Sequence, residues 1–165
     1  MHKIYLPKTV FAVSGIGTGI VNLLLSLIPL AVVMMICGVA PRLPIIFLPI
    51  PLVLLASFAL GTGLLLSTFA VYFPDVAEMY EIALSAWLYL TPIIYPESII
   101  SERLRPWLFN LNPMYHLVKL FRLTLYDQRW PELNQVLLAG LVAVVPLMIG
   151  WMIFTRNADE IPYRI

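Results

Sequence analysis

Three carboxylates stand close together in the middle of the chain, at Asp75, Glu78 and Glu81. At this spacing they fall within the first two turns of one helix, where they could relay protons or serve a membrane-embedded transferase acting on lipid-linked intermediates. An apolar run follows directly, which favours a role at a helix start, because the helix dipole stabilises carboxylates there. We therefore expect no catalytic residue here, with the transferase as the alternative.

The other reactive side chains are too scattered for the common catalytic arrangements. His2 and His116 lie far apart, and no HExxH or CxxC pair is present, so no metal site is predicted. No GxxxxGK[ST] phosphate loop occurs, so we expect no nucleotide or other cofactor on this chain. A net charge of +1 without a long basic run gives no indication of nucleic acid as a partner.

The composition indicates whether the chain folds in water or in a lipid bilayer. Of 165 residues, 61% are hydrophobic and 12% are charged, and the mean hydropathy is +0.93. Ordinary soluble domains carry about 25% charged residues. Because so few charges could not cover a core of this size, the chain is predicted to be an integral membrane protein.

Long runs without Asp, Glu, Lys or Arg place the membrane spans. The runs cover residues 9–41, 44–74 and 134–155, and each exceeds the about 20 residues that cross a bilayer. A shorter apolar segment follows Glu78 and Glu81, and it spans only if both carboxylates lie at the interface or face protein. Within a single transmembrane domain, residues 1–165, the predicted spans are about 10–37, 49–71, 76–95 and 133–154.

The segment before the last span has a different character. In 114–125, apolar residues recur at helical spacing, while His116, Lys119 and Arg122 lie three apart on a more polar flank. This pattern is typical of an amphipathic helix. The predicted fold class is therefore all-α: a polytopic transmembrane helical bundle with a re-entrant or interfacial amphipathic helical hairpin at about 103–126, broken at Asn112 and Pro113.

Small residues and aromatic residues mark two further features. Gly15 with Gly19, Ser57 with Gly61, and Ala59 with Gly63 have the four-residue spacing of close helix packing in lipid. Trp and Tyr residues gather around the predicted hairpin, as in an interfacial belt, or alternatively along a path for a sugar-bearing substrate. An even number of spans puts both ends on one side, but the charge pattern does not choose that side.

Two proline-containing segments carry a resemblance to a known family. Residues 90–96, Leu-Thr-Pro-Ile-Ile-Tyr-Pro, and residues 111–114, Leu-Asn-Pro-Met, followed by Arg122, resemble ABC-2 type transport permeases of the branch exporting O-antigen and teichoic acid. The motif residues are Pro92, Pro96, Asn112, Pro113 and Arg122. Residues 72–76 resemble the loop before the family's fifth span, although Pro74 stands where an arginine is usual, which puts any role of that arginine in doubt.

The resemblance implies a mechanism. The family fold has six spans and works as a permease pair, here a homodimer, driven by a separate ATPase subunit that holds ATP and Mg²⁺ and moves a lipid-linked glycan outward across the cell inner membrane. Both termini would be cytoplasmic. Lys3, Pro7, Lys8 and Asp75 would lie near the ATPase or in cytoplasmic loops, and Trp87, Tyr89, Tyr95 and Tyr115 would be candidates for the glycan path.

This chain resembles the last four spans, so it is expected to be shortened at its N-terminus. A non-functional permease fragment that only packs with other membrane proteins is therefore a further alternative.

Overall fold

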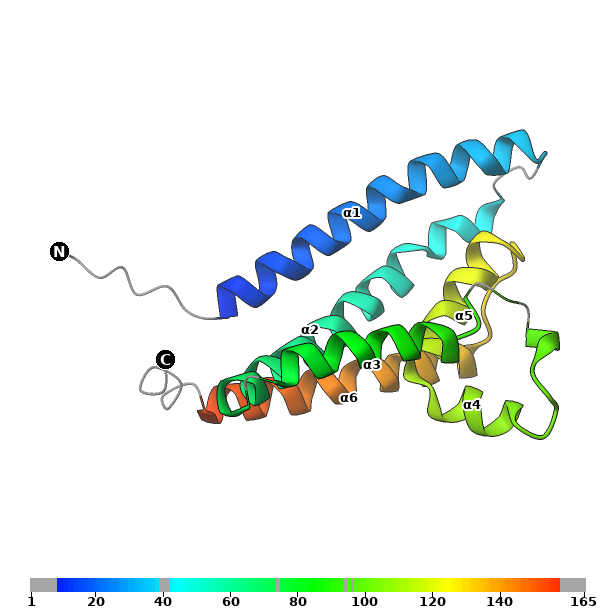
Figure 1. Cartoon of the computed structure of the whole chain (residues 1–165). Coiled ribbons are helices and arrows are strands. Elements are labelled where there is room, and N and C mark those ends of the chain that lie inside the picture. The colour runs from blue at the N-terminus through cyan, green and yellow to red at the C-terminus, as the bar shows by residue number, and fades with distance from the viewer. Residues whose placement is uncertain (1–8, 39–41, 74, 94, 96, 158–165) are drawn as a thin grey trace.

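The computed structural model describes residues 9–38, 42–73, 75–93, 95 and 97–157, and within these ranges the chain is almost entirely helical (Figure 1). The long helices are α1 (Thr9–Ile36), α2 (Pro49–Tyr72), α3 (Val76–Leu90) and α6 (Leu133–Asn157). Two shorter helices, α4 (Arg105–Leu111) and α5 (Pro113–Leu125), lie between α3 and α6. Single short 3-10 turns precede α2 (η1, Leu43–Phe47) and α4 (η2, Glu97–Ile99). The predicted all-α fold is confirmed.

The four long helices run alternately in opposite directions, so that Thr9 and Asn157 lie at the same end of the bundle (Figure 1). The helices α4 and α5 gather at the other end, beside the C-terminal end of α3 and the start of α6. This arrangement separates two ends of different composition. One end holds the connection between α2 and α3, and the other holds α4 and α5, the segment rich in charged and aromatic residues.

Helices α2 and α6 form the closest pair in the bundle, and two glycines make that approach possible. A Cβ atom placed on Gly61 would collide with backbone atoms of Pro146 and Leu147, and one on Gly150 would collide with the backbone of Gly61. Without side chains at these positions the two backbones pack directly, as small residues allow in lipid. Gly61 therefore confirms the predicted packing role, whereas Gly15, Gly19 and Gly63 face open space within this chain.

The largest buried cluster lies where α2, α5 and α6 meet. Phe58 comes from α2, and Ala139 and Ala143 come from α6, while Leu117 and Leu120 of α5 are fully buried. The small alanines let α5 lie close to α6, and the two leucines fill the remaining space. The helix predicted for 114–125 is confirmed, but its packed face is turned from the predicted apolar stripe, because Leu120 is buried although only Leu117 belongs to that stripe.

Long apolar surfaces remain exposed around this core, as expected of a protein solvated by lipid. Among the described residues, three segments are long and apolar enough to cross a membrane: Ser14–Ile36, Leu43–Tyr72 and Leu133–Asn157. In α1 the most apolar window has no buried residue. Side chains such as Ile28, Val53 and Leu141 are more than half exposed. Since water would penalise such a surface heavily, the fold is that of a membrane protein.

The fourth predicted span differs from its expected length. The sequence predicts a span over residues 76–95, but the helix ends at Leu90, and its 15 residues reach only about 22 Å. The reason is Pro92, because a proline disfavours helical backbone in the residue before it. Thr91 is accordingly extended, with φ −96° and ψ 125°. The crossing of α3 therefore stays a prediction, and Ile94 and Pro96 lie outside the described residues.

The predicted break in the amphipathic segment is confirmed. Helix α4 ends at Leu111, Asn112 is extended with φ −88° and ψ 105°, and α5 begins at Pro113. Proline suits the first position of a helix because its missing N–H would have no partner there. Asn112 completes the start of α5 by accepting a hydrogen bond from the Met114 backbone N–H at 3.1 Å.

Candidate functional site

Asn112 is the centre of a polar network that joins the two proline segments. It is 7% exposed, and both ends of its amide are used. The Oδ1 atom accepts from the indole Nε1 of Trp87 at 2.8 Å, and Nδ2 donates to Thr91 Oγ1 at 2.9 Å. Residues more than 20 positions apart in sequence are thereby held in contact, and α5 is fixed to the C-terminal end of α3.

Thr91 extends the network back onto α3. Its hydroxyl donates to the Trp87 carbonyl at 2.9 Å while accepting from Asn112, so a side chain that is 1% exposed is fully paired. The Thr91 backbone N–H also donates to the Trp87 carbonyl. Helix ends leave carbonyl groups without partners, and these bonds satisfy one of them where proline stops the helix.

A second set of contacts lies around Arg122. Its Nη2 donates to the Pro92 carbonyl oxygen at 2.7 Å, and its Nη1 lies 3.7 Å from the Glu97 carboxylate. Pro92 and Arg122 both belong to the motif segments, and the structure brings them into direct contact. We call the network of Trp87, Thr91, Asn112, Glu97 and Arg122, with the Pro92 carbonyl, the polar latch.

We expect the two charged members of the latch to differ in importance. Arg122→Gln removes a short hydrogen bond to a carbonyl and should reduce stability by about 1–2 kcal/mol. Glu97→Gln removes the charge of an ion pair whose side chains are 31% and 38% exposed but keeps an oxygen for the Tyr115 hydroxyl, and should cost less than about 1 kcal/mol. Thermal unfolding of both variants in detergent tests this order. Equal losses would show that the ion pair, and not the bond to Pro92, carries the contribution of Arg122.

Tyr115 connects the latch to α4. Its ring stacks on Phe109 with centroids 4.3 Å apart, and its hydroxyl donates to Glu97 Oε1 at 3.2 Å. Burial, reinforced by the negative charge of Glu97, raises the pKa of Tyr115 to about 12. The phenol therefore stays protonated throughout the physiological range and acts as a hydrogen-bond donor.

The four aromatic residues proposed for a glycan path occupy different environments. Trp87 is half-buried against Phe58 in an edge-to-face contact, and Tyr115 is buried. Tyr89 is 70% exposed, and the Tyr95 hydroxyl donates to the Tyr89 carbonyl at 2.7 Å. The structure thus brings Tyr89 and Tyr95 together on the surface and uses Trp87 and Tyr115 in packing. Their part in a substrate path stays a prediction.

A large apolar cleft adjoins the latch. Its volume is about 720 Å³, and its walls come mainly from α2 and α3, with Trp87 and Met114 at one end. The lining is almost entirely apolar and includes Leu66, Phe69 and Leu84. Thr62 and Ser67 add hydroxyl groups. Such a surface suits an acyl chain or another apolar helix.

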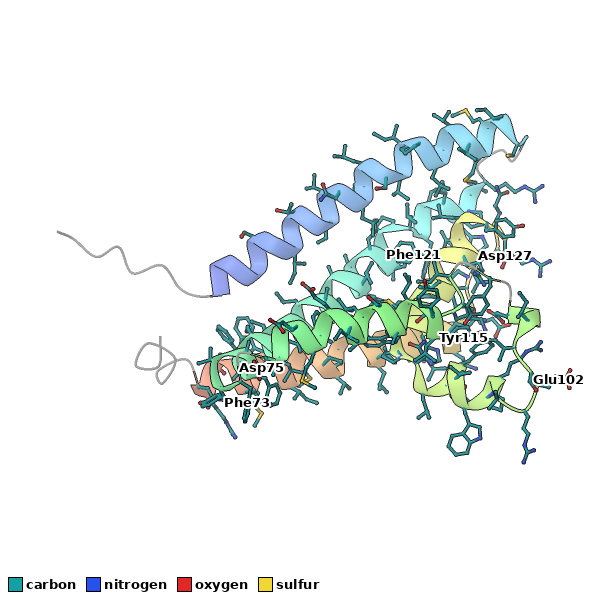
Figure 2. All side chains as sticks on the ribbon, viewed as in Figure 1. Phe73, Asp75, Glu102, Tyr115, Phe121 and Asp127 are labelled. Atoms are coloured by element: carbon teal, nitrogen blue, oxygen red, sulfur yellow. The ribbon has the colours of Figure 1, made fainter. Side chains whose placement is uncertain are left out.

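Asp75 is the one described residue among those proposed for the ATPase-facing surface or a cytoplasmic loop, and it lies away from the latch. Asp75 is exposed beside Phe73 at the connection of α2 and α3, opposite the end that carries Tyr115 (Figure 2). Glu78 lies in the first turn of α3 and is exposed, as predicted from its position at a helix start. Lys3, Pro7 and Lys8 lie outside the described residues.

Glu97 is the latch member that the sequence did not reveal. Its only signal is a carboxylate directly after Pro96, and nothing in that spacing points to Arg122 or Tyr115. The partners are 25 and 18 residues away in the chain, and they meet because α5 folds back along the end of α3.

The exposed apolar helices and the latch define a polytopic helical membrane protein in which α4 and α5 are fixed to one end of the bundle. Comparison with known proteins then gives the family, because the profile described as "ABC-2 type transporter" matches residues 1–126. The chain belongs to the ABC-2 type transporter family.

Curated relatives agree with this assignment. The chain is 28% identical over 161 residues to the "O-antigen export system permease protein RfbA" of Myxococcus xanthus, covering 97% of this chain and 62% of the relative. It is 21% identical over 158 residues to a protein of the same description from Klebsiella pneumoniae, covering 94% of this chain and 60% of that relative. The chain thus spans about three fifths of the length of these relatives.

Proposed function

We propose that the chain acts as a membrane permease subunit of an ABC transporter that exports lipid-linked polysaccharide. The observation that carries the proposal is similarity over 97% of this chain to a protein described as an O-antigen export permease. That similarity includes the latch and α6 as well as the region of the family profile. The exposed apolar helices support the membrane setting, since a permease must be solvated by lipid.

The proposed energy source is a separate ATPase subunit. ATP and Mg²⁺ would bind to that partner, and a second copy of the permease would complete the channel. Asp75 and the connection of α2 and α3 are candidates for the ATPase-facing surface, because they lie at the same end of the bundle as the start of α1 and the end of α6 (Figures 1 and 2). In this arrangement both termini are cytoplasmic in the inner membrane, and α4 and α5 are on the outer side.

The test combines genetics with purification from the native membrane. Deleting the coding sequence should abolish nearly all surface polysaccharide and cause lipid-linked polysaccharide to accumulate inside the cell. Re-expression should restore export, and an affinity tag on the chain should recover an ABC ATPase, identified by mass spectrometry. A cell that displays normal surface polysaccharide without this chain would refute the proposal, as would export that continues when the recovered ATPase carries an inactivated phosphate loop.

A further inference from the structure

A second pocket lies between α4, α5 and the first turns of α6, on a different set of residues from the apolar cleft. Its volume is about 430 Å³, and Phe109 and Tyr115 form an aromatic wall. Arg105 enters it from α4, and His116 and Lys119 enter it from α5. Asn110 and Gln135 add amide groups. None of the described lining residues is Asp or Glu.

The basic residues of this pocket differ from Arg122 in their partners. Arg122 is engaged by the Pro92 carbonyl and by Glu97. In contrast, Arg105 and Lys119 form no ion pair with a carboxylate among the described residues, and Lys119 lies 5.5 Å above the ring of Tyr115. Glu97, the acid that contacts Tyr115 of this pocket, also pairs with Arg122. The pocket is therefore positively charged and uncompensated within the described chain.

One atom of Arg105 has no hydrogen-bond partner. The Nε of Arg105 is buried and has no hydrogen-bond partner among the described residues. A buried donor without a partner costs about 1–3 kcal/mol, and more on a charged group. Arg105 also lines the pocket, and a planar guanidinium can bind an anion through two parallel hydrogen bonds, which is the geometry of arginine with phosphate.

The location of the pocket favours an anion attached to apolar chains. Gln135 and Leu138 place its edge on the first turns of α6, where that helix begins its long apolar run. Leu138 at this edge, and Leu137 and Leu141 on the same helix, are each at least half exposed. A molecule with its phosphate in the pocket could lay acyl chains along these leucines, at the depth where polar and apolar surface meet.

We propose that this pocket binds a phosphate group, carried either by a membrane lipid or by a soluble phosphate compound, through Arg105 and Lys119. His116 and the amides of Asn110 and Gln135 provide further donors around it. The site does not depend on transport, because it needs neither an ATPase nor a polysaccharide.

Binding to the purified full chain in detergent tests the proposal. Native mass spectrometry would compare phosphatidylglycerol with diacylglycerol of the same acyl chains, and inorganic pyrophosphate would be added as the soluble probe. Phosphate-bearing probes should be retained in preference to diacylglycerol. Arg105→Gln and Lys119→Gln should each weaken that binding about tenfold, the effect of losing about one charge-assisted hydrogen bond.

Arg103→Gln is the matched control, because it removes the same charge from an exposed position two residues away. Binding of phosphatidylglycerol that pyrophosphate does not displace would identify a lipid headgroup, and displacement would identify a soluble phosphate; either supports the proposed chemistry. No preference over diacylglycerol and no retention of pyrophosphate would overturn the proposal, as would equal weakening by Arg103→Gln. If Arg105→Gln does not fold, Lys119→Gln alone decides.

Discussion

Gly61→Val is expected to destabilise the protein by about 3 kcal/mol, the upper end of the usual cost of overpacking, because the added side chain collides with main-chain atoms. A side chain here must displace the backbone of α6 at Pro146 and Leu147. Neither helix can yield by rotating a side chain, since the colliding atoms belong to the main chain. The two helices must separate, and contacts along their whole shared length weaken together. Thermal unfolding and size-exclusion profiles in detergent measure the loss.

Gly63→Val provides the matched control. It makes the same change in the same helix, two residues further on, where an added Cβ meets nothing within 4 Å. Both variants share the intrinsic helix propensity of valine, so their difference isolates the contact with α6. We expect Gly63→Val to unfold close to the wild-type temperature. If both variants are equally impaired, the close approach of α2 and α6 is not the cause.

These two glycines also show what a sequence can and cannot determine. Gly61 and Gly63 each follow a small residue by four positions, so spacing alone assigns both to packing faces. In the structure they point about 200° apart around α2, since each residue turns a helix by about 100°. Gly61, and not Gly63, is the packing glycine because α6 lies on that side of α2. The position of α6 depends on contacts between segments far apart in the chain.

The three long apolar helices α1, α2 and α6 and the break at Asn112 were predictable for a different reason. Lipid excludes charge from a long stretch of chain, which leaves a trace in composition that needs no knowledge of tertiary contacts. Proline likewise acts on its immediate neighbours, so the start of α5 at Pro113 follows from sequence. The end of α3 was missed because the apolar run continues past Thr91, although Pro92 already stops the helix.

The polar latch was predictable only in part. The resemblance to a family identified Pro92, Asn112, Pro113 and Arg122, but it did not show that these residues touch one another. Their contacts cross from the end of one helix to the start of another, and hydrogen bonds of this kind have no periodicity in sequence. The structure adds a physical reason for the motif, because Asn112 and Arg122 supply bonds that tie α5 to the end of α3.

Asn112→Ala is expected to reduce stability by about 3 kcal/mol. It leaves the Trp87 indole N–H without its acceptor, removes the donor to Thr91, and deletes the cap of α5. A buried donor without a partner costs about 1–3 kcal/mol, and a lost cap costs about 1 kcal/mol. Asn134→Ala, at an exposed position in the first turn of α6, serves as the control and should change the unfolding temperature little.

Asn112→Ser separates the two roles of Asn112, which are to cap the start of α5 and to bond to Trp87 and Thr91 at the end of α3. A serine oxygen can still accept from the Met114 N–H, so α5 keeps its cap, but it is too short to reach both Trp87 and Thr91. Hydrogen–deuterium exchange should therefore increase around Thr91 and the start of α5 in this variant, while exchange in α2 and α6 stays at the wild-type level. If the serine variant behaved like the wild type in α3 and α5, the cap alone would explain Asn112. Increased exchange limited to that region would instead show that the latch fastens α4 and α5 to a bundle that is stable without it.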